Sequence, residues 1–140
     1  NAKALDLLKK NKGEIVLVSN NNWKKVWKKR FKKPLRDLES FQYKKKNNIK
    51  YLSEIGAKPK KISSIKGQFA GLFKITPKGW KVMLEYIKKD KVNINNLDIT
   101  SFFSAFVKKH SDFIQIANYN GMWFEVDTVK DFKILNSKKY

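Results

Sequence analysis

A continuous apolar run near the start of the chain sets the strongest constraint on the fold. Glu14 to Ser19 reads Glu-Ile-Val-Leu-Val-Ser, with no polar residue between its two ends. Such a run is typical of a strand that is buried on both faces of a sheet. A second run, Gln68 to Ile75, opens after Gly67 and is interrupted by Gly71. Two strands of this kind predict a sheet that is covered by helices.

Segments with helical periodicity alternate with these runs. Thr76 and Pro77 supply an N-cap followed by proline at the first helical position, which predicts a helix that continues to about Lys89. Its buried face is predicted to contain Trp80, Met83, Leu84 and Ile87. Other helices are expected over Ala2–Lys10, over Trp23–Phe31 with Pro34 closing it, from Asp98 or Thr100 through Val107 with Phe102, Phe103 and Phe106 buried, and after Thr128, where Asp131 completes a capping box.

Two hairpins are predicted from asparagine-containing turns. The first joins Phe41–Lys45 to Ile49–Ile55 through Asn47-Asn48, whose side chains tolerate positive φ. The second joins Phe113–Tyr119 to Met122–Val126 through Asn120-Gly121, the strongest short hairpin signal in the chain. Because strands and helices alternate around these hairpins, we predict an α/β fold in which a mixed sheet carries flanking helices.

Charge and composition limit the classes of function. The net charge is +20, from 32 basic and 12 acidic residues, which invites a nucleic-acid partner. Only Arg30 and Arg36 are arginines, however, and the lysines are spread along the whole chain. Because arginine is the residue that grips phosphates and bases bidentately, we favour a lysine-coated surface over a nucleic-acid-binding face.

Other classes are excluded by residues that the sequence lacks. There is no cysteine, so disulfides and thiolate metal sites are absent, and His110 is the only histidine. No apolar run is long enough to span a bilayer, and no signal peptide is visible. We therefore expect a cytoplasmic location and no membrane partner.

The segment Gly121–Thr128 carries the candidate chemistry. As part of a strand, Glu125 and Asp127 would face the same side, and Asp127 would lie at the strand-to-helix junction, where α/β sheets bind ligands. Magnesium takes such oxygen ligands, with only one or two carboxylates beside phosphate oxygens. The alternative is structural: Asp127 caps the next helix and Glu125 is solvated.

The segment from Trp123 to Thr128, Trp-Phe-Glu-Val-Asp-Thr, resembles the C-terminal signature of the nucleotidyltransferases that activate phosphocholine or sugar phosphates. The resemblance covers nearly the whole chain and implies the C-terminal part of a Rossmann-like nucleotidyltransferase fold. Other matching pieces follow in the family's order: Trp27-Lys-Lys-Arg-Phe31 with Pro34-Leu35, Ile55–Pro59, Gly67–Lys74 and Asp98–Phe102.

The resemblance also implies roles for individual residues. Asp127 carries over as a Mg²⁺ ligand, with Trp123 and Glu125 in support, and Gln68 and Asp98 match positions near the acceptor. Asn20 departs from the pattern, which has an aspartate near this point. Independently, aromatic side chains can cage a quaternary ammonium group, and the candidates for such a cage are Trp23, Trp27, Tyr119 and Trp123.

Several family features are absent from the sequence. It has no glycine-rich phosphate loop and no earlier aspartate to share the metal, and it begins at Asn1 rather than at methionine. We therefore expect residues 1–140 to be a single domain that is the C-terminal part of a longer nucleotidyltransferase, truncated at its N-terminus and inactive alone. Its partners would be CTP or another NTP, a phosphorylated acceptor and the missing N-terminal part. A basic nucleic-acid-binding module and a non-catalytic remnant remain alternatives.

Overall fold

The centre of the molecule is a five-stranded mixed sheet with strand order β2-β3-β5-β1-β4. The computed structural model describes residues 2–31, 35 and 38–137, so Pro34 and Arg36 lie outside the described residues. The strands are β1 (Ile15–Asn20), β2 (Phe41–Lys46), β3 (Ile49–Ile55), β4 (Gln68–Ile75) and β5 (Ile114–Tyr119). The helices are α1 (Ala2–Lys10), α2 (Trp23–Arg30), α3 (Pro77–Lys89), α4 (Ile99–Lys109) and α5 (Val129–Asn136), with a short 3-10 helix, η2 (Ile62–Ser64).

Strand β1 is buried on both faces, as its apolar run predicts. It pairs in parallel with β5 and antiparallel with β4. Ile15 and Leu17 enter the larger hydrophobic cluster, whereas Val16 and Val18 enter a smaller one. Because successive side chains of a strand point to opposite faces, these two clusters lie on the two sides of the sheet.

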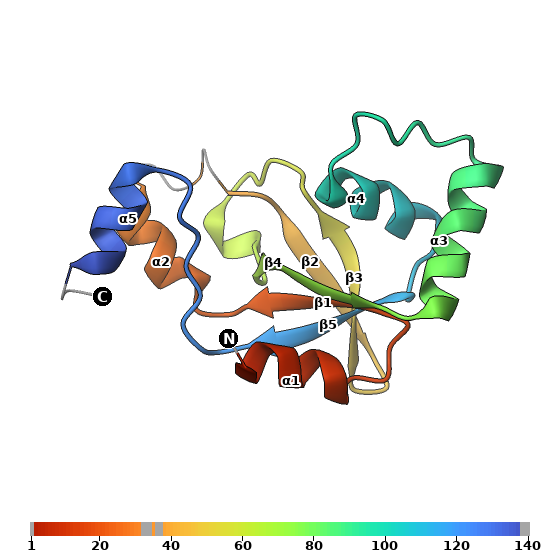
Figure 1. Ribbon diagram of the computed structural model, residues 1–140, viewed down its shortest axis with the longest axis horizontal. Helices are drawn as coiled ribbons and strands as arrows, with labels where there is room; N and C mark the ends of the chain where they lie inside the picture. Colours follow the sequence, from red (N-terminus) through yellow and green to blue (C-terminus); the bar gives the residue numbers. More distant parts are fainter. Residues whose placement is uncertain (1, 32–34, 36–37, 138–140) are drawn as a thin grey trace.

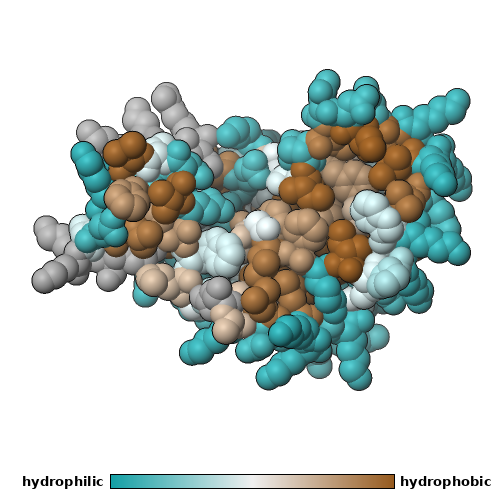
Figure 2. Space-filling view, viewed as in Figure 1, coloured by the Kyte–Doolittle hydropathy of each residue, from teal (hydrophilic) through white to brown (hydrophobic). Residues whose placement is uncertain are grey.

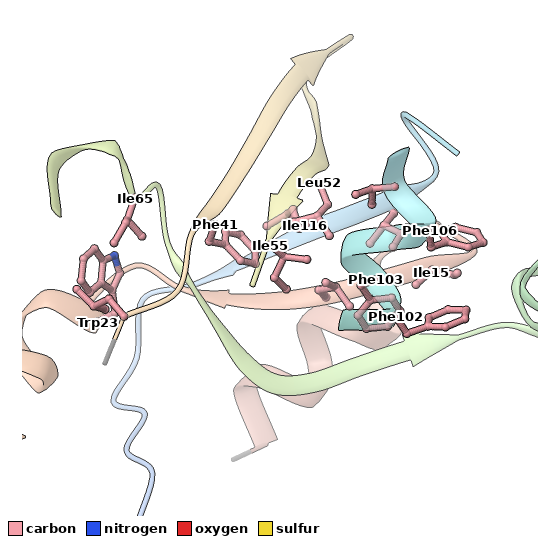
Figure 3. Close-up of a cluster of buried hydrophobic side chains, with 14 of the residues drawn as sticks. Ile15, Trp23, Phe41, Leu52, Ile55, Ile65, Phe102, Phe103, Phe106 and Ile116 are labelled. Atoms are coloured by element: carbon pink, nitrogen blue, oxygen red, sulfur yellow. The ribbon is translucent and has the colours of Figure 1, made fainter. Parts of the chain in front are cut away.

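Helices cover both faces of the sheet. On one side, α4 packs Phe102, Phe103 and Phe106 against β-strand residues such as Ile15 and Ile116 (Figure 3). On the other side, α1 covers β1 and β5, as seen in Figure 1. Figure 2 shows apolar side chains gathered over the middle of one face, with hydrophilic side chains around much of its rim. The predicted α/β class, a mixed sheet with flanking helices, is confirmed.

The buried face of α3 differs from the predicted one. Trp80 is 50% exposed, and the buried residues of this helix are Gly79, Met83 and Tyr86. A Cβ on Gly79 would lie 2.6 Å from the carbonyl oxygen of Glu14, so the helix approaches the start of β1 closely at this glycine. That close approach turns the neighbouring Trp80 away from the sheet.

The first predicted hairpin is confirmed. Strands β2 and β3 pair antiparallel, and Asn47 and Asn48 between them have φ values of 50° and 62°. Both values are in the left-handed region that a two-residue type I′ turn requires.

The second predicted hairpin is wrong. Residues 122–127 follow β5 but belong to no helix or strand, so Asp127 does not end a strand. One edge of β5 is taken by β1 along its whole length, and β3 pairs with the other edge at Gln115. The segment leaves the sheet instead and runs toward α2, where its carboxylates meet Arg30.

Across the described ranges, no helix has both the length and the apolar character that crossing a membrane requires.

Candidate functional site

A buried arginine joins the end of α2 to the segment that follows β5. The Arg30 side chain is only 2% exposed. Its Nε donates to Asp131 Oδ1 at 2.9 Å, and its Nη2 donates to Asp131 Oδ2 at 3.2 Å and to Asp127 Oδ2 at 2.6 Å. Its Nη1 lies 3.5 Å from Glu125 Oε2. One guanidinium group therefore holds three carboxylates from a single stretch of chain.

Aromatic rings enclose the same guanidinium group. Its Cζ lies 5.4 Å from the ring centroid of Trp27, 4.9 Å from that of Phe31 and 5.6 Å from that of Phe124. These distances are within the range of cation–π attraction, which strengthens when water is excluded. From the sequence alone, Arg30 is identified only as a member of the motif Trp27–Phe31. Its rarity was the available signal, since it is one of two arginines in a strongly basic chain.

The cluster shifts the pKa values of its members in different directions. Hydrogen bonds from Arg30 lower the pKa of Asp131 to about 2. Burial, together with the nearby charge of Asp127, raises the pKa of Glu125. Burial alone would lower the pKa of Arg30, but hydrogen bonds to Asp131 and Asp127 raise it above its usual value. The guanidinium group is therefore charged at every pH at which the protein is folded.

These shifts predict an acid-dependent loss of stability. The pKa of Asp131 is about 2 in the folded chain against 3.8 as its ordinary value, so its contribution is complete above about pH 4 and is lost as the pH falls toward 2. The shift corresponds to about 2 kcal/mol of unfolding free energy. Glu125, whose pKa is raised, acts in the opposite sense and offsets part of this loss.

The measurement is urea denaturation of the wild type and of Asp131→Asn at several pH values between 5 and 2. The variant should be less stable at pH 5 but should lose about 2 kcal/mol less than the wild type on acidification. Parallel pH profiles for the two proteins would contradict the assignment.

Three of the predicted substrate-binding residues line one cavity of about 350 Å³. Trp27, Gln68 and Glu125 meet there, although they come from α2, from β4 and from the segment after β5. Glu39, which the sequence interpretation missed, lines the cavity too, and its carbonyl oxygen accepts a hydrogen bond from Gln68 Nε2 at 2.8 Å. The indole N–H of Trp27 is buried and has no hydrogen-bond partner within the described chain. The remaining lining residues are Phe69, Gly71, Ile99 and Thr100.

Asp127 faces a second cavity, of about 520 Å³. Arg30, Lys58 and Lys130 line this cavity as well. Glu125, which lines the first cavity, and Asp127, which lines the second, both pair with Arg30, so the arginine cluster borders both cavities. The remaining lining residues of the second cavity are Phe31, Thr128 and Asp131.

A magnesium ion would find one accessible carboxylate here. The Asp127 side chain is 66% exposed, and one of its oxygens accepts from Arg30. Residues 2–31, 35 and 38–137 contain no group of three or more acidic or histidine side chains placed to hold a metal ion. Asp127 could therefore supply one carboxylate ligand, and an ion bound there would need phosphate and water to complete its shell.

The other aromatic residues predicted for a cage do not join this cavity. Trp23 is buried in the larger core and meets Trp27 edge to face, with ring centroids 6.4 Å apart. Trp123 packs with Tyr119 against the smaller core on the side of α1. Only Trp27 of the four predicted aromatic residues lines the cavity that contains Gln68 and Glu125.

Asp98 is the N-cap of α4. Its Oδ1 accepts from the backbone N–H of Ser101 at 2.9 Å, and its Oδ2 accepts from the Ser101 hydroxyl at 2.6 Å. These hydrogen bonds lower the pKa of Asp98. The next residues of the helix, Ile99 and Thr100, line the cavity that contains Trp27. Asp98 thus sets the start of a helix that borders the candidate acceptor site.

This geometry predicts a capping effect at Asp98. Asp98→Ala should lower the unfolding free energy by about 1 kcal/mol, whereas Asp98→Asn should change it by a few tenths, because asparagine caps about as well. Thermal unfolding of both variants measures the difference. Equal losses for alanine and asparagine would show that the carboxylate charge, and not the cap, stabilises this site.

The end of β1 carries amides where the family pattern has an aspartate. Asn20 is buried, and its Oδ1 accepts from the N–H of Asn22 at 2.8 Å. In the adjacent parallel strand, Asn118 pairs in register with Ser19. Side-chain atoms of Ser19, Asn20 and Asn118 are buried without partners in the described chain. The ends of the two parallel strands are thus polar but uncharged.

Comparison with known proteins supports the resemblance. No family model matches the chain. It is 30% identical over 130 residues to a CTP:phosphoglutamine cytidylyltransferase from Campylobacter jejuni. The match covers 88% of the chain but 49% of that protein, so the chain spans about half the length of the curated relative it matches. Over this length the chain is similar to part of a cytidylyltransferase.

Proposed function

We propose that the chain is the acceptor-binding part of a nucleotidyltransferase that transfers CMP from CTP to a phosphorylated small molecule. A phosphate oxygen of the acceptor would attack the α-phosphorus of CTP in line, and pyrophosphate would leave. One observation supports this proposal: Glu125 and Asp127 both pair with Arg30, and each lines a different cavity. A cytoplasmic location, expected from the sequence, is part of the same proposal.

The two cavities would bind different groups: one the metal ion and the phosphates, the other the acceptor. Asp127 would hold Mg²⁺, and when bound the ion would neutralise negative charge on the phosphates. Lys58 and Lys130 line the same cavity and would attract those phosphates. The protein's own contribution is to hold the acceptor and the nucleotide in line for attack, which is worth several kcal/mol of the barrier.

The cavity beside Glu125 suits an acceptor with a cationic group. Glu125 and Glu39 provide negative charge there, and Trp27 and Phe69 provide aromatic surface. Carboxylates and aromatic rings together bind ammonium groups. Phosphocholine, which is among the molecules activated by the family that the sequence resembles, has such a group. The relative acts on phosphoglutamine by its name, so acceptors that carry an amine form the first panel to test.

The test is CTP-dependent release of pyrophosphate. The chain would be produced alone and in an extended form, either with any coding sequence found upstream of Asn1 or fused to the N-terminal half of the Campylobacter relative. We expect the extended protein to release pyrophosphate with at least one acceptor among phosphocholine, phosphoglutamine, phosphoethanolamine, an aminophosphonate and a sugar phosphate. The chain alone should release none, because it lacks a glycine-rich loop to cradle the triphosphate.

Two other results would favour a function other than nucleotidyl transfer. A folded, extended protein that is inactive with every acceptor would favour a non-catalytic remnant. Tight binding of DNA or RNA that weakens steeply as salt is raised would favour a nucleic-acid-binding module.

A further inference from the structure

The segment that carries both candidate carboxylates has no regular secondary structure. Residues 122–127 lie between the end of β5 and the N-cap of α5 and belong to no helix or strand. A strand position would fix Glu125 and Asp127 through a ladder of backbone hydrogen bonds, and that ladder is missing here. The contacts that bear directly on the two carboxylates are their ion pairs with Arg30.

We infer that Arg30 is the positioning residue of this site, and that it aims Glu125 at one cavity and Asp127 at the other. The inference rests on the proposed function only for the use made of the two carboxylates. Its structural basis is that separate nitrogens of one guanidinium group meet them: Nη1 faces Glu125 and Nη2 faces Asp127. Because the guanidinium group is planar and rigid, it sets the direction of both contacts together.

The guanidinium group is itself held by Asp131. Asp131 accepts from Nε at 2.9 Å and from Nη2 at 3.2 Å, and it is buried. Asp131 also closes the capping box of α5 with Thr128. The first turn of α5 therefore fixes Asp131, and Asp131 fixes Arg30. Arg30 in turn holds Glu125 and Asp127.

Further contacts hold the backbone of Arg30 and enclose its guanidinium group. Lys130 Nζ donates to the backbone carbonyl oxygen of Arg30 at 3.0 Å, which ties the last residue of α2 to α5. The rings of Trp27, Phe31 and Phe124 lie around the guanidinium group and exclude water from it. A lysine at this position would carry the same charge, but its single ammonium group could not reproduce the fork that meets three carboxylates.

The first test measures mobility in the 140-residue chain by ¹⁵N relaxation rates and the ¹H–¹⁵N heteronuclear NOE, which together give backbone order parameters. In Arg30→Lys, the buried charge and a contact with Asp131 can persist, so the chain should still fold. We expect the backbone order parameters of residues 123–127 to fall from about 0.85 to below about 0.6, while those of α4 and β5 stay unchanged. Under conditions in which Arg30→Gln is folded, this variant should show the same fall in the order parameters of residues 123–127.

The matched control is Lys28→Gln, which removes one exposed positive charge from the same helix. It should leave the order parameters of residues 123–127 unchanged. The inference is overturned if Arg30→Lys leaves these residues as rigid as in the wild type, or if Lys28→Gln mobilises them equally.

The second test uses an extended, active protein. Arg30→Lys should raise the KM for the acceptor and the Mg²⁺ concentration at half-maximal rate, each by about tenfold, because both carboxylates lose their fixed direction. Unchanged values of both parameters would overturn the positioning role. If the extended protein has no cytidylyltransferase activity at all, the proposed function fails, and the mobility test still decides the role of Arg30.

Discussion

Replacing Asp127 with asparagine should reduce CTP-dependent turnover by about a hundredfold or more in an extended, active protein. Asparagine has nearly the same size and keeps an oxygen that can accept from Arg30 Nη2. It lacks the negative charge that a divalent cation requires from its ligand. If Asp127 binds Mg²⁺, the loss should therefore appear in turnover at saturating magnesium.

Stability should hardly change in the same variant. The side chain of Asp127 is 66% exposed, and exposed ion pairs contribute at most about 1 kcal/mol. The measurements are pyrophosphate release and melting temperature for the wild type and Asp127→Asn. Asp112→Asn is the matched control, because Asp112 also pairs with a basic side chain, Lys46, at the surface. Wild-type turnover in Asp127→Asn would remove Asp127 from the metal site.

Replacing Arg30 with methionine should lower the unfolding free energy by about 3–5 kcal/mol. The change leaves Asp131, which is 4% exposed, as a buried carboxylate without its cation. Breaking a buried pair from one side costs more than the pair itself contributes, because the remaining charge stays desolvated. Glu125 and Asp127 add less to this loss, since both are more exposed than Asp131.

Urea denaturation of the chain measures this loss. Lys28→Met, at an exposed position of the same helix, should change the unfolding free energy by less than about 0.5 kcal/mol. The double variant Arg30→Met/Asp131→Leu should recover part of the loss, because it leaves no buried charge. A loss below about 1 kcal/mol in Arg30→Met would show that water reaches the cluster and screens it.

Local signals predicted most of the secondary structure. The apolar run of β1, the Thr76–Pro77 helix start and the Asn47-Asn48 turn all depend on residues within a few positions of each other. The predicted hairpin at Asn120-Gly121 failed because a turn signal does not tell whether the sheet has room for the returning strand. Here β5 already has neighbours on both edges, and Arg30 attracts the following segment elsewhere.

The site was predictable only where local sequence motifs mark its residues. The family resemblance pointed to Gln68 and Glu125, and the aromatic-cage argument pointed to Trp27. The three residues share one cavity, but their meeting depends on the packing of three separate elements. Glu39 was missed because no motif surrounds it. The link between Arg30 and Asp131 joins residues 101 positions apart, and no local pattern predicts a contact of that kind.

The position of β1 between β4 and β5 has a consequence for how the chain folds during synthesis. Its two strand partners, β4 and β5, begin at Gln68 and Ile114. The first of the five strands in sequence can therefore pair fully only after the last one has been made. Contacts this far apart in sequence slow folding, because a long loop must close before the contact stabilises anything. Until the ribosome has made residues 114–119, the apolar run from Ile15 to Val18 lacks the parallel neighbour that shields it in the folded chain. Nascent chains halted before Tyr119 should therefore be cut readily by proteases and bind chaperones, and resistance should arise abruptly once β5 has emerged.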